Sequence, residues 1–126
     1  MGPTHRLDRD RNAMFTTVEG PITLQDICVH IEEERVQGGL GCAELIDARS
    51  ASSAVTREDV RTLVALLRKW SERYELGPTA VVVSTDLAYG MLRMLDILVE
   101  EFCVVQPFRD MEMAQRWLYE GRGVSG

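Results

Sequence analysis

Short apolar segments alternate with amphipathic segments of helical length along this chain, and that alternation restricts the fold more than any other feature. The clearest apolar segment is Ala80-Val81-Val82-Val83, a run typical of a strand covered on both faces. The turn Ser84-Thr85-Asp86 follows it and supplies a helix N-cap. Because strand–helix–strand units of this length pair in parallel through right-handed crossovers, we expect an α/β domain.

Four helices are expected, and capping residues mark where they begin. Thr23 and Thr56 each precede an aspartate by three residues, a pattern of helix N-termini, and the helix after Thr23 is expected to end near Arg35. The helix after Thr56 has a continuous apolar face of Val60, Leu63, Val64, Leu67, Trp70 and Tyr74. The next helix is predicted to bury Leu87, Met91, Met94, Leu95, Leu98 and Phe102 and to expose Tyr89, Arg93, Asp96 and Glu100. Asp110 caps a last helix.

Besides the run at 80–83, strands are predicted over residues 5–9, 13–19, 42–47 and 103–105. The turn Asp10-Arg11-Asn12 would join the first two as a hairpin, and Gly20-Pro21 would end the second. A polar loop is expected after Asp47, and Pro107 would end the last strand. The predicted fold is a single mixed sheet of about five strands with about four helices, in the order β-β-α-β-α-β-α-β-α.

Length and composition favour one ordered domain over residues 1–126, with flexible ends at about 1–4 and 120–126. A hydrophobic fraction of 45% with 27% charged residues disfavours general disorder. Cys28, Cys42 and Cys103 are an odd number without close pairing, which favours free thiols in a reducing compartment. No apolar run approaches the roughly 20 residues of a membrane span, and no signal peptide is recognisable, so we expect a cytoplasmic protein.

The net charge and the weaker motifs exclude several classes of function. A formal charge of −6 repels polyanions, so no nucleic acid partner is expected. The glycines at 38–41 follow a helix and precede a strand, the reverse of a phosphate-binding loop. Ser84 lacks the flanking glycines of a nucleophile elbow, and no catalytic set is recognised.

No metal site and no cofactor are expected. His5 and His30 have no ligand partners at a suitable spacing other than the run Glu32-Glu33-Glu34, and we interpret that run as a solvated helix surface.

Polar residues after the predicted strands form the strongest candidate site, because open α/β sheets bind ligands beyond the carboxyl ends of their strands. The segments are 47–56, 84–89 and 108–110. The candidate ligand- or partner-binding residues are Asp47, Arg49, Thr56, Ser84, Asp86, Tyr89, Arg93 and Arg109. Helix N-termini and arginines there would accommodate a small anionic ligand or a phosphorylated hydroxyl. The alternative is ordinary helix capping with solvated loop charge.

Three stretches together with the element order resemble the SpoIIAA-like domains, relatives of the STAS domain of anti-sigma-factor antagonists. The stretches are Glu44-Leu45-Ile46-Asp47-Ala48-Arg49, Ala80-Val81-Val82-Val83-Ser84-Thr85-Asp86-Leu87-Ala88-Tyr89-Gly90-Met91, and Phe108-Arg109-Asp110 with Ala114 and Trp117-Leu118. The resemblance extends from about residue 13 to 118. It implies a mixed sheet with helices mainly on one face, and a non-enzymatic role in partner binding or ligand sensing.

The chain departs from the antagonists at the helix that begins near Thr56. The antagonists have a phosphorylatable serine there in an Asp-Ser-Ser-Gly-like motif, and this chain has Ala54-Val55-Thr56-Arg57-Glu58. Thr56 is the only hydroxyl at the helix start and is a weak candidate for phosphorylation. Glu58 and Asp59 would repel a phosphate on it.

The first hypothesis is therefore a protein-interaction or sensing module. One alternative is a small-molecule or lipid-binding protein that uses the same polar segments, and another is a small enzyme with Asp47, Asp86 or Tyr89 as acid or base. A homodimer is also expected if the helices cover mainly one sheet face, because residues 81–83 would then need cover on the other.

Overall fold

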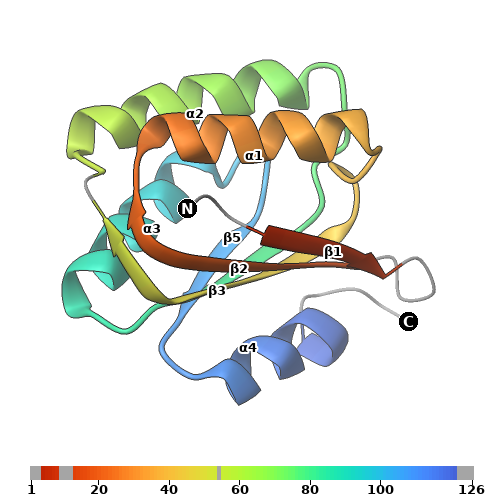
Figure 1. The fold of residues 1–126 in the computed structure, drawn as a ribbon. Coiled ribbons are helices and arrows are strands. Elements are labelled where there is room, and N and C mark those ends of the chain that lie inside the picture. The colour runs from red at the N-terminus through yellow and green to blue at the C-terminus, as the bar shows by residue number, and fades with distance from the viewer. Residues whose placement is uncertain (1–3, 9–12, 54, 122–126) are drawn as a thin grey trace.

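The computed structural model describes residues 4–8, 13–53 and 55–121, and their strands form one sheet in the order β1-β2-β3-β4-β5 (Figure 1). The strands are β1 (Thr4–Asp8), β2 (Ala13–Ile22), β3 (Ala43–Ser53), β4 (Thr79–Val82) and β5 (Val105–Phe108). The helices are α1 (Leu24–Val36), α2 (Arg57–Ser71), α3 (Asp86–Val99) and α4 (Met111–Arg116), which continues into a π-helical turn, η1 (Trp117–Gly121). The predicted alternation is confirmed for the parallel strands β2 to β5 and the four helices. The alternating part has four strands and not five, because β1 joins antiparallel at the edge.

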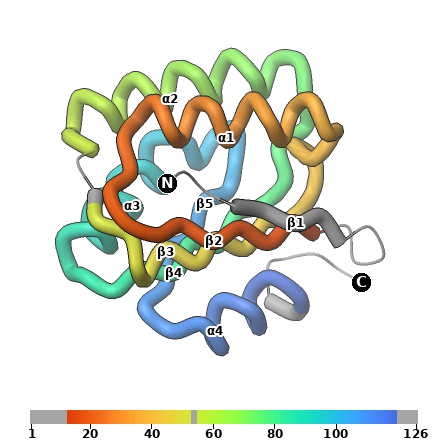
Figure 2. The backbone as a smooth tube through the Cα atoms, viewed as in Figure 1, coloured from red at the N-terminus to blue at the C-terminus, as the bar shows by residue number. Residues whose placement is uncertain are grey.

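Helices cover both faces of the sheet, with α1, α2 and α3 on one side and α4 on the other (Figure 2). On one face α1, α2 and α3 pack against the sheet around Ile31, Val60, Leu63, Val81, Val83, Leu95, Val99 and Val105. On the other face α4 and η1 bring Ala114 and Leu118 against Ala43, Leu45, Ala80 and Val82. The run at 80–83 is therefore covered on both faces, as its composition predicts. The second face does not lack cover, since α4 and η1 supply it, so this argument for a homodimer does not hold and dimerisation itself stays a prediction.

The helix ends follow the local signals in the sequence. Thr23 and Thr56 form capping boxes with Asp26 and Asp59, in which each threonine oxygen accepts a backbone N–H and each aspartate accepts one in return. After α1, Gly38 has a φ of +75°, its N–H donates to Arg35 O, and the Gly39 N–H donates to Glu34 O at 2.7 Å. This pair of hydrogen bonds forms a Schellman motif, so the glycine segment ends a helix as predicted.

Two strands run further than predicted. β2 continues through Gly20-Pro21 and β3 continues to Ser53, where Glu19 to Ile22 pair with Ser50 to Ser53. Among the described residues β1 pairs with β2 as far as Thr17, and Pro21 lies beyond that pairing, where a strand tolerates proline. The expected loop after Asp47 is therefore mostly strand.

The last strand also differs from its prediction. It begins at Val105 and contains Pro107, whereas residues 103–104 precede it. β5 is the edge strand, and proline is tolerated where one side of the strand has no ladder to join. The predicted turn at residues 10–12 and the tail after residue 121 lie outside the described residues.

The buried face of α3 matches the predicted one in part, since Met91, Met94, Leu95 and Phe102 pack in the core as predicted. Leu95 and Val99 are buried, and Ala88 and Leu92 pack against the same core, a spacing of four, three and four residues. Leu87 is 78% exposed and Leu98 43% exposed, and half-buried Tyr89 contacts the core. Among the described helices, none is long and apolar enough to cross a bilayer.

Gly77 lies in the segment that connects α2 to β4, and Gly90 makes a matched control for testing how closely that segment packs against Cys42. A Cβ on Gly77 would lie 2.1 Å from the backbone oxygen of Cys42, whereas a Cβ on Gly90, within α3, meets nothing within 4 Å. We expect Gly77→Ala to reduce the free energy of unfolding by about 1–3 kcal/mol through overpacking. Gly90→Ala should raise it by about 0.5–1 kcal/mol through helix propensity. Urea denaturation measures both, and equal midpoints for the two variants would contradict the prediction.

Candidate functional site

Five of the predicted candidate residues are joined by hydrogen bonds at the carboxyl ends of β4 and β5 and at the point in β3 where its pairing with β4 ends, at Asp47. The Arg49 guanidinium donates to both carboxylate oxygens of Asp47, at 2.9 and 2.8 Å. The Ser84 hydroxyl donates to the Arg49 carbonyl at 2.9 Å, and Arg109 donates to the Ser84 carbonyl at 2.9 Å. Arg109 also donates to the Asp86 carboxylate. We call these five residues the edge network, and it links three strands to the first turn of α3.

The edge network is an exposed surface of paired charges. The side chain of Asp86 is 99% exposed and those of Arg49 and Arg109 are about half exposed. The hydrogen bond from Arg49 holds the pKa of Asp47 below its usual value, with burial opposing that shift. A carboxylate held in its ionised form is a poor general acid at neutral pH, which disfavours Asp47 in the enzyme alternative.

The other three candidates make their described contacts elsewhere. Thr56 caps α2, and its hydroxyl oxygen accepts the Asp59 N–H at 3.1 Å. Tyr89 packs against the core between the sheet and helices α1 to α3. Arg93 pairs with Asp96 on α3 at 3.3 Å. Thr56 is exposed, so its phosphorylation stays a prediction.

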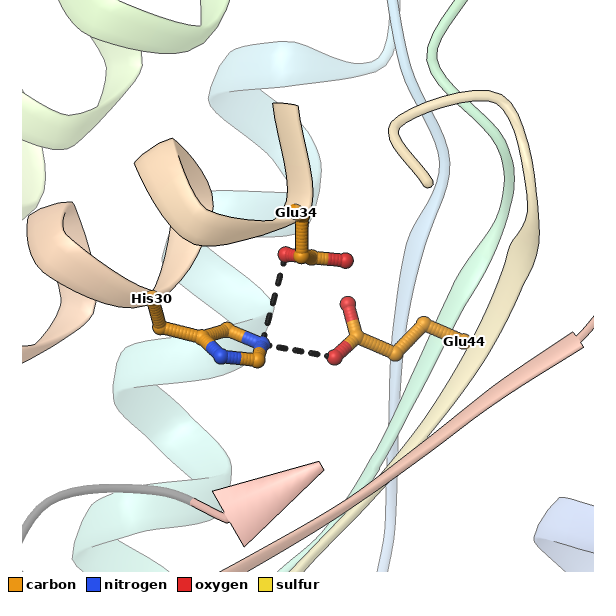
Figure 3. Close-up of side chains that lie close together, drawn as sticks. All are labelled: His30, Glu34 and Glu44. Atoms are coloured by element: carbon orange, nitrogen blue, oxygen red, sulfur yellow. Dashed lines mark hydrogen bonds and ion pairs between the residues drawn. The ribbon is translucent and has the colours of Figure 1, made fainter. Parts of the chain in front are cut away.

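A second group of polar residues lies inside the molecule between α1 and β3 (Figure 3). The His30 Nε2 atom is 2.8 Å from Glu44 Oε2 and 3.3 Å from Glu34 Oε1. The Thr16 hydroxyl, from β2, donates to Glu44 Oε2 at 2.6 Å. The side chains of His30, Glu34 and Glu44 are 7%, 8% and 6% exposed. We call these three residues the buried cluster.

Burial and hydrogen bonding divide the two carboxyl groups of the buried cluster into different protonation states. Burial, followed by the charge of Glu44 and a hydrogen bond to it, raises the pKa of Glu34 to about 10. Burial would also raise the pKa of Glu44, but hydrogen bonds from His30, Glu34 and Thr16 outweigh it and hold that pKa below its usual value. At neutral pH the pair therefore shares one proton, carried by Glu34, and the charge resides on Glu44.

The buried cluster contradicts our interpretation of residues 32–34 as a solvated surface. Glu32 and Glu33 are exposed, but Glu34 is one helical turn after His30 and faces the sheet with it. The sequence contains a signal that we did not use: His30 and Glu34 have an i, i+4 spacing, and Glu44 is a charged residue within the apolar start of β3. His30, Glu34 and Glu44 offer ligand atoms within 4.8 Å of one another, so they could hold a metal ion.

No protein-family model matches the chain, and no curated protein matches its sequence. A similar solved structure is an uncharacterised DUF3478-family protein with a SpoIIAA-like fold from Shewanella loihica PV-4. The two superpose with a TM-score of 0.62 over 93% of this chain and 94% of that chain, at 16% identity. The chain has a SpoIIAA-like fold.

The resemblance drawn from the three sequence stretches is thus confirmed at the level of the fold. All three stretches contribute to the SpoIIAA-like domain's edge network: the first supplies Asp47 and Arg49, the second Ser84 and Asp86, and the third Arg109. The implied arrangement of helices is also present, with α1, α2 and α3 on one face (Figure 1).

Proposed function

We propose that this SpoIIAA-like domain is a non-enzymatic interaction module that binds a partner protein through the edge network. The observation that carries the proposal is the continuous hydrogen-bonded chain from Asp47, in β3, to Asp86 across the carboxyl ends of β4 and β5. Its atoms are positioned by the sheet but exposed to solvent. A rigid, exposed set of donors and acceptors is suited to docking a second surface.

The mixture of charges and an exposed apolar side chain favours a protein over a small anion. Arg49 and Arg109 already pair with Asp47 and Asp86, so a lone anion would compete with two carboxylates of the domain itself. Leu87 follows Asp86 and is 78% exposed, which gives the surface an apolar contact beside its charged groups. A partner surface with complementary charges around an apolar recess matches this combination. An anionic lipid surface matches it less well, because the chain carries a net charge of −6.

Site-specific photocrosslinking tests the proposal. A photoreactive amino acid replacing Leu87 should form a discrete adduct with one protein in the source cells, identifiable by mass spectrometry. The same residue at Ile97 is the control, since Ile97 is 58% exposed on the same helix. We expect no such adduct from position 97.

A charge reversal makes the crosslinking test specific to the edge network. Arg109→Glu should abolish the adduct from position 87, because it places a negative charge beside Asp86. The domain should remain folded, since an exposed ion pair contributes only about 0–1 kcal/mol. Identical adducts from positions 87 and 97, no adduct at either, or an adduct unaffected by Arg109→Glu would each contradict the proposal.

A further inference from the structure

We propose that His30, Glu34 and Glu44 form a binding site for one divalent transition-metal ion, with Zn²⁺ as the probe. The site is separate from the edge network. It lies between α1 and β3, on the face of the sheet that α1, α2 and α3 cover (Figure 3).

Two of the three distances between the ligand atoms are close to those around a bound metal, and all three atoms lie within 4.8 Å of one another. Two ligands at about 2.1 Å from a tetrahedral ion lie about 3.4 Å apart. The distance from His30 Nε2 to Glu34 Oε1 is 3.3 Å, and that from Nε2 to Glu44 Oε2 is 2.8 Å. The second distance would have to open by about 0.6 Å to meet the tetrahedral value. Small changes in the three side-chain torsions of Glu44 would supply this opening.

The chemistry of the buried cluster also suits a divalent cation. Two carboxylates and a neutral imidazole carry two negative charges, which balance the charge of a divalent ion. The ion in turn offsets the repulsion between the Glu34 and Glu44 carboxylates. One nitrogen and two oxygen ligands suit Zn²⁺, Fe²⁺ or Mn²⁺, whereas Mg²⁺ and Ca²⁺ prefer all-oxygen sites with several waters. Three protein ligands leave a fourth position for another group.

The backbone holds the three residues in place without a metal. His30 and Glu34 lie on α1, which a capping box and a Schellman motif fix at its two ends. Glu44 lies on β3, which pairs with β2 on one side and β4 on the other. A metal ion would therefore join a preformed helix face to the middle of the sheet, and it would stabilise the folded state by mass action.

Metal binding can be measured on the full chain after chelator treatment and dialysis. At equimolar Zn²⁺ we expect one ion per chain by elemental analysis and a rise in Tm. Glu34→Gln keeps the size of the side chain but removes a ligand, so its affinity should fall at least about 100-fold, more than the loss of an outer contact typically costs. Glu33→Gln is the control, because Glu33 is the adjacent glutamate on the exposed side of α1.

A second readout identifies the ligand directly in the unaltered protein. The ¹⁵N resonance of His30 Nε2 should shift when Zn²⁺ is added, and Mg²⁺ at the same concentration should leave it unchanged. Absence of bound Zn²⁺ in the wild type, equal affinities of Glu34→Gln and Glu33→Gln, or an unshifted His30 resonance would each overturn the proposal. Zinc held by the cysteines instead would give equal affinities for the two variants and an unshifted His30 resonance.

Discussion

Glu44→Ala is expected to lower the free energy of unfolding by about 3–5 kcal/mol, because it removes the acceptor at the centre of a buried polar network. Hydrogen bonds from His30 and Thr16 end on the Glu44 carboxylate, at 2.8 and 2.6 Å. Without it, Thr16 and His30 stay buried and lose this acceptor, and a cavity forms between α1 and β3. Urea denaturation at neutral pH in the presence of a chelator measures the change.

An exposed glutamate provides the control for the Glu44 substitution. Glu101→Ala changes the same type of side chain just after α3, where it is exposed, and should alter stability by no more than about 0.5 kcal/mol. If Glu44→Ala cost less than about 1 kcal/mol, the network would contribute little to stability, contrary to our expectation.

The metal-free protein is expected to lose stability as the pH rises, chiefly through Glu34. Its pKa is about 10 in the folded state against a usual value of 4.5, so the folded protein retains a proton that the unfolded chain releases. This contribution is fully present below pH 4.5 and is lost progressively as the pH rises toward 10. The expected loss is about 1.4 kcal/mol per pH unit, or roughly 2–3 kcal/mol between pH 5 and pH 7.

Glu34→Gln should remove most of this pH dependence. Glutamine cannot titrate, and its amide N–H can donate to Glu44 in place of the carboxyl proton. The variant should therefore be more stable than the wild type at neutral pH, and denaturation midpoints from about pH 5 to pH 9 with a chelator present would show a flatter profile. Glu44 titrates with the opposite sign, because its lowered pKa makes stability fall only as the pH drops below 4.5. Parallel profiles for the variant and the wild type would show that Glu34 is not the group responsible.

The edge network could be predicted from the sequence because parallel strands bring their carboxyl ends to one edge. Ser84 and Arg109 each follow the end of a strand, and Asp47 follows the apolar run of β3 at its last position paired with β4. The pairing within the network could not be predicted, since Ser84 and Arg49 are 35 residues apart and meet through the register of β3 and β4. Tyr89 and Arg93 were placed in the same group by sequence proximity, but the turn of α3 directs them to other contacts.

The buried cluster was missed for a related reason. An acidic run on a helix has the same local pattern whether its last member faces water or a sheet, and the direction depends on how α1 packs. Glu34 is buried because the face that includes His30 lies over β2 and β3, where Thr16 and Glu44 are its polar partners. Those contacts join residues 14 and 28 positions apart in the chain.

The alternation of apolar strands and capped helices was determined by the sequence alone, as were the helix starts at Thr23, Thr56 and Asp110. These features depend on interactions within about one turn of helix or one strand, so local residue order is sufficient for them. Only the tertiary structure decided how far β2 and β3 extend, which face of α3 is buried, and that Glu34 meets Glu44. Each of these depends on a neighbour distant in the chain, where pairing and desolvation outweigh local preference.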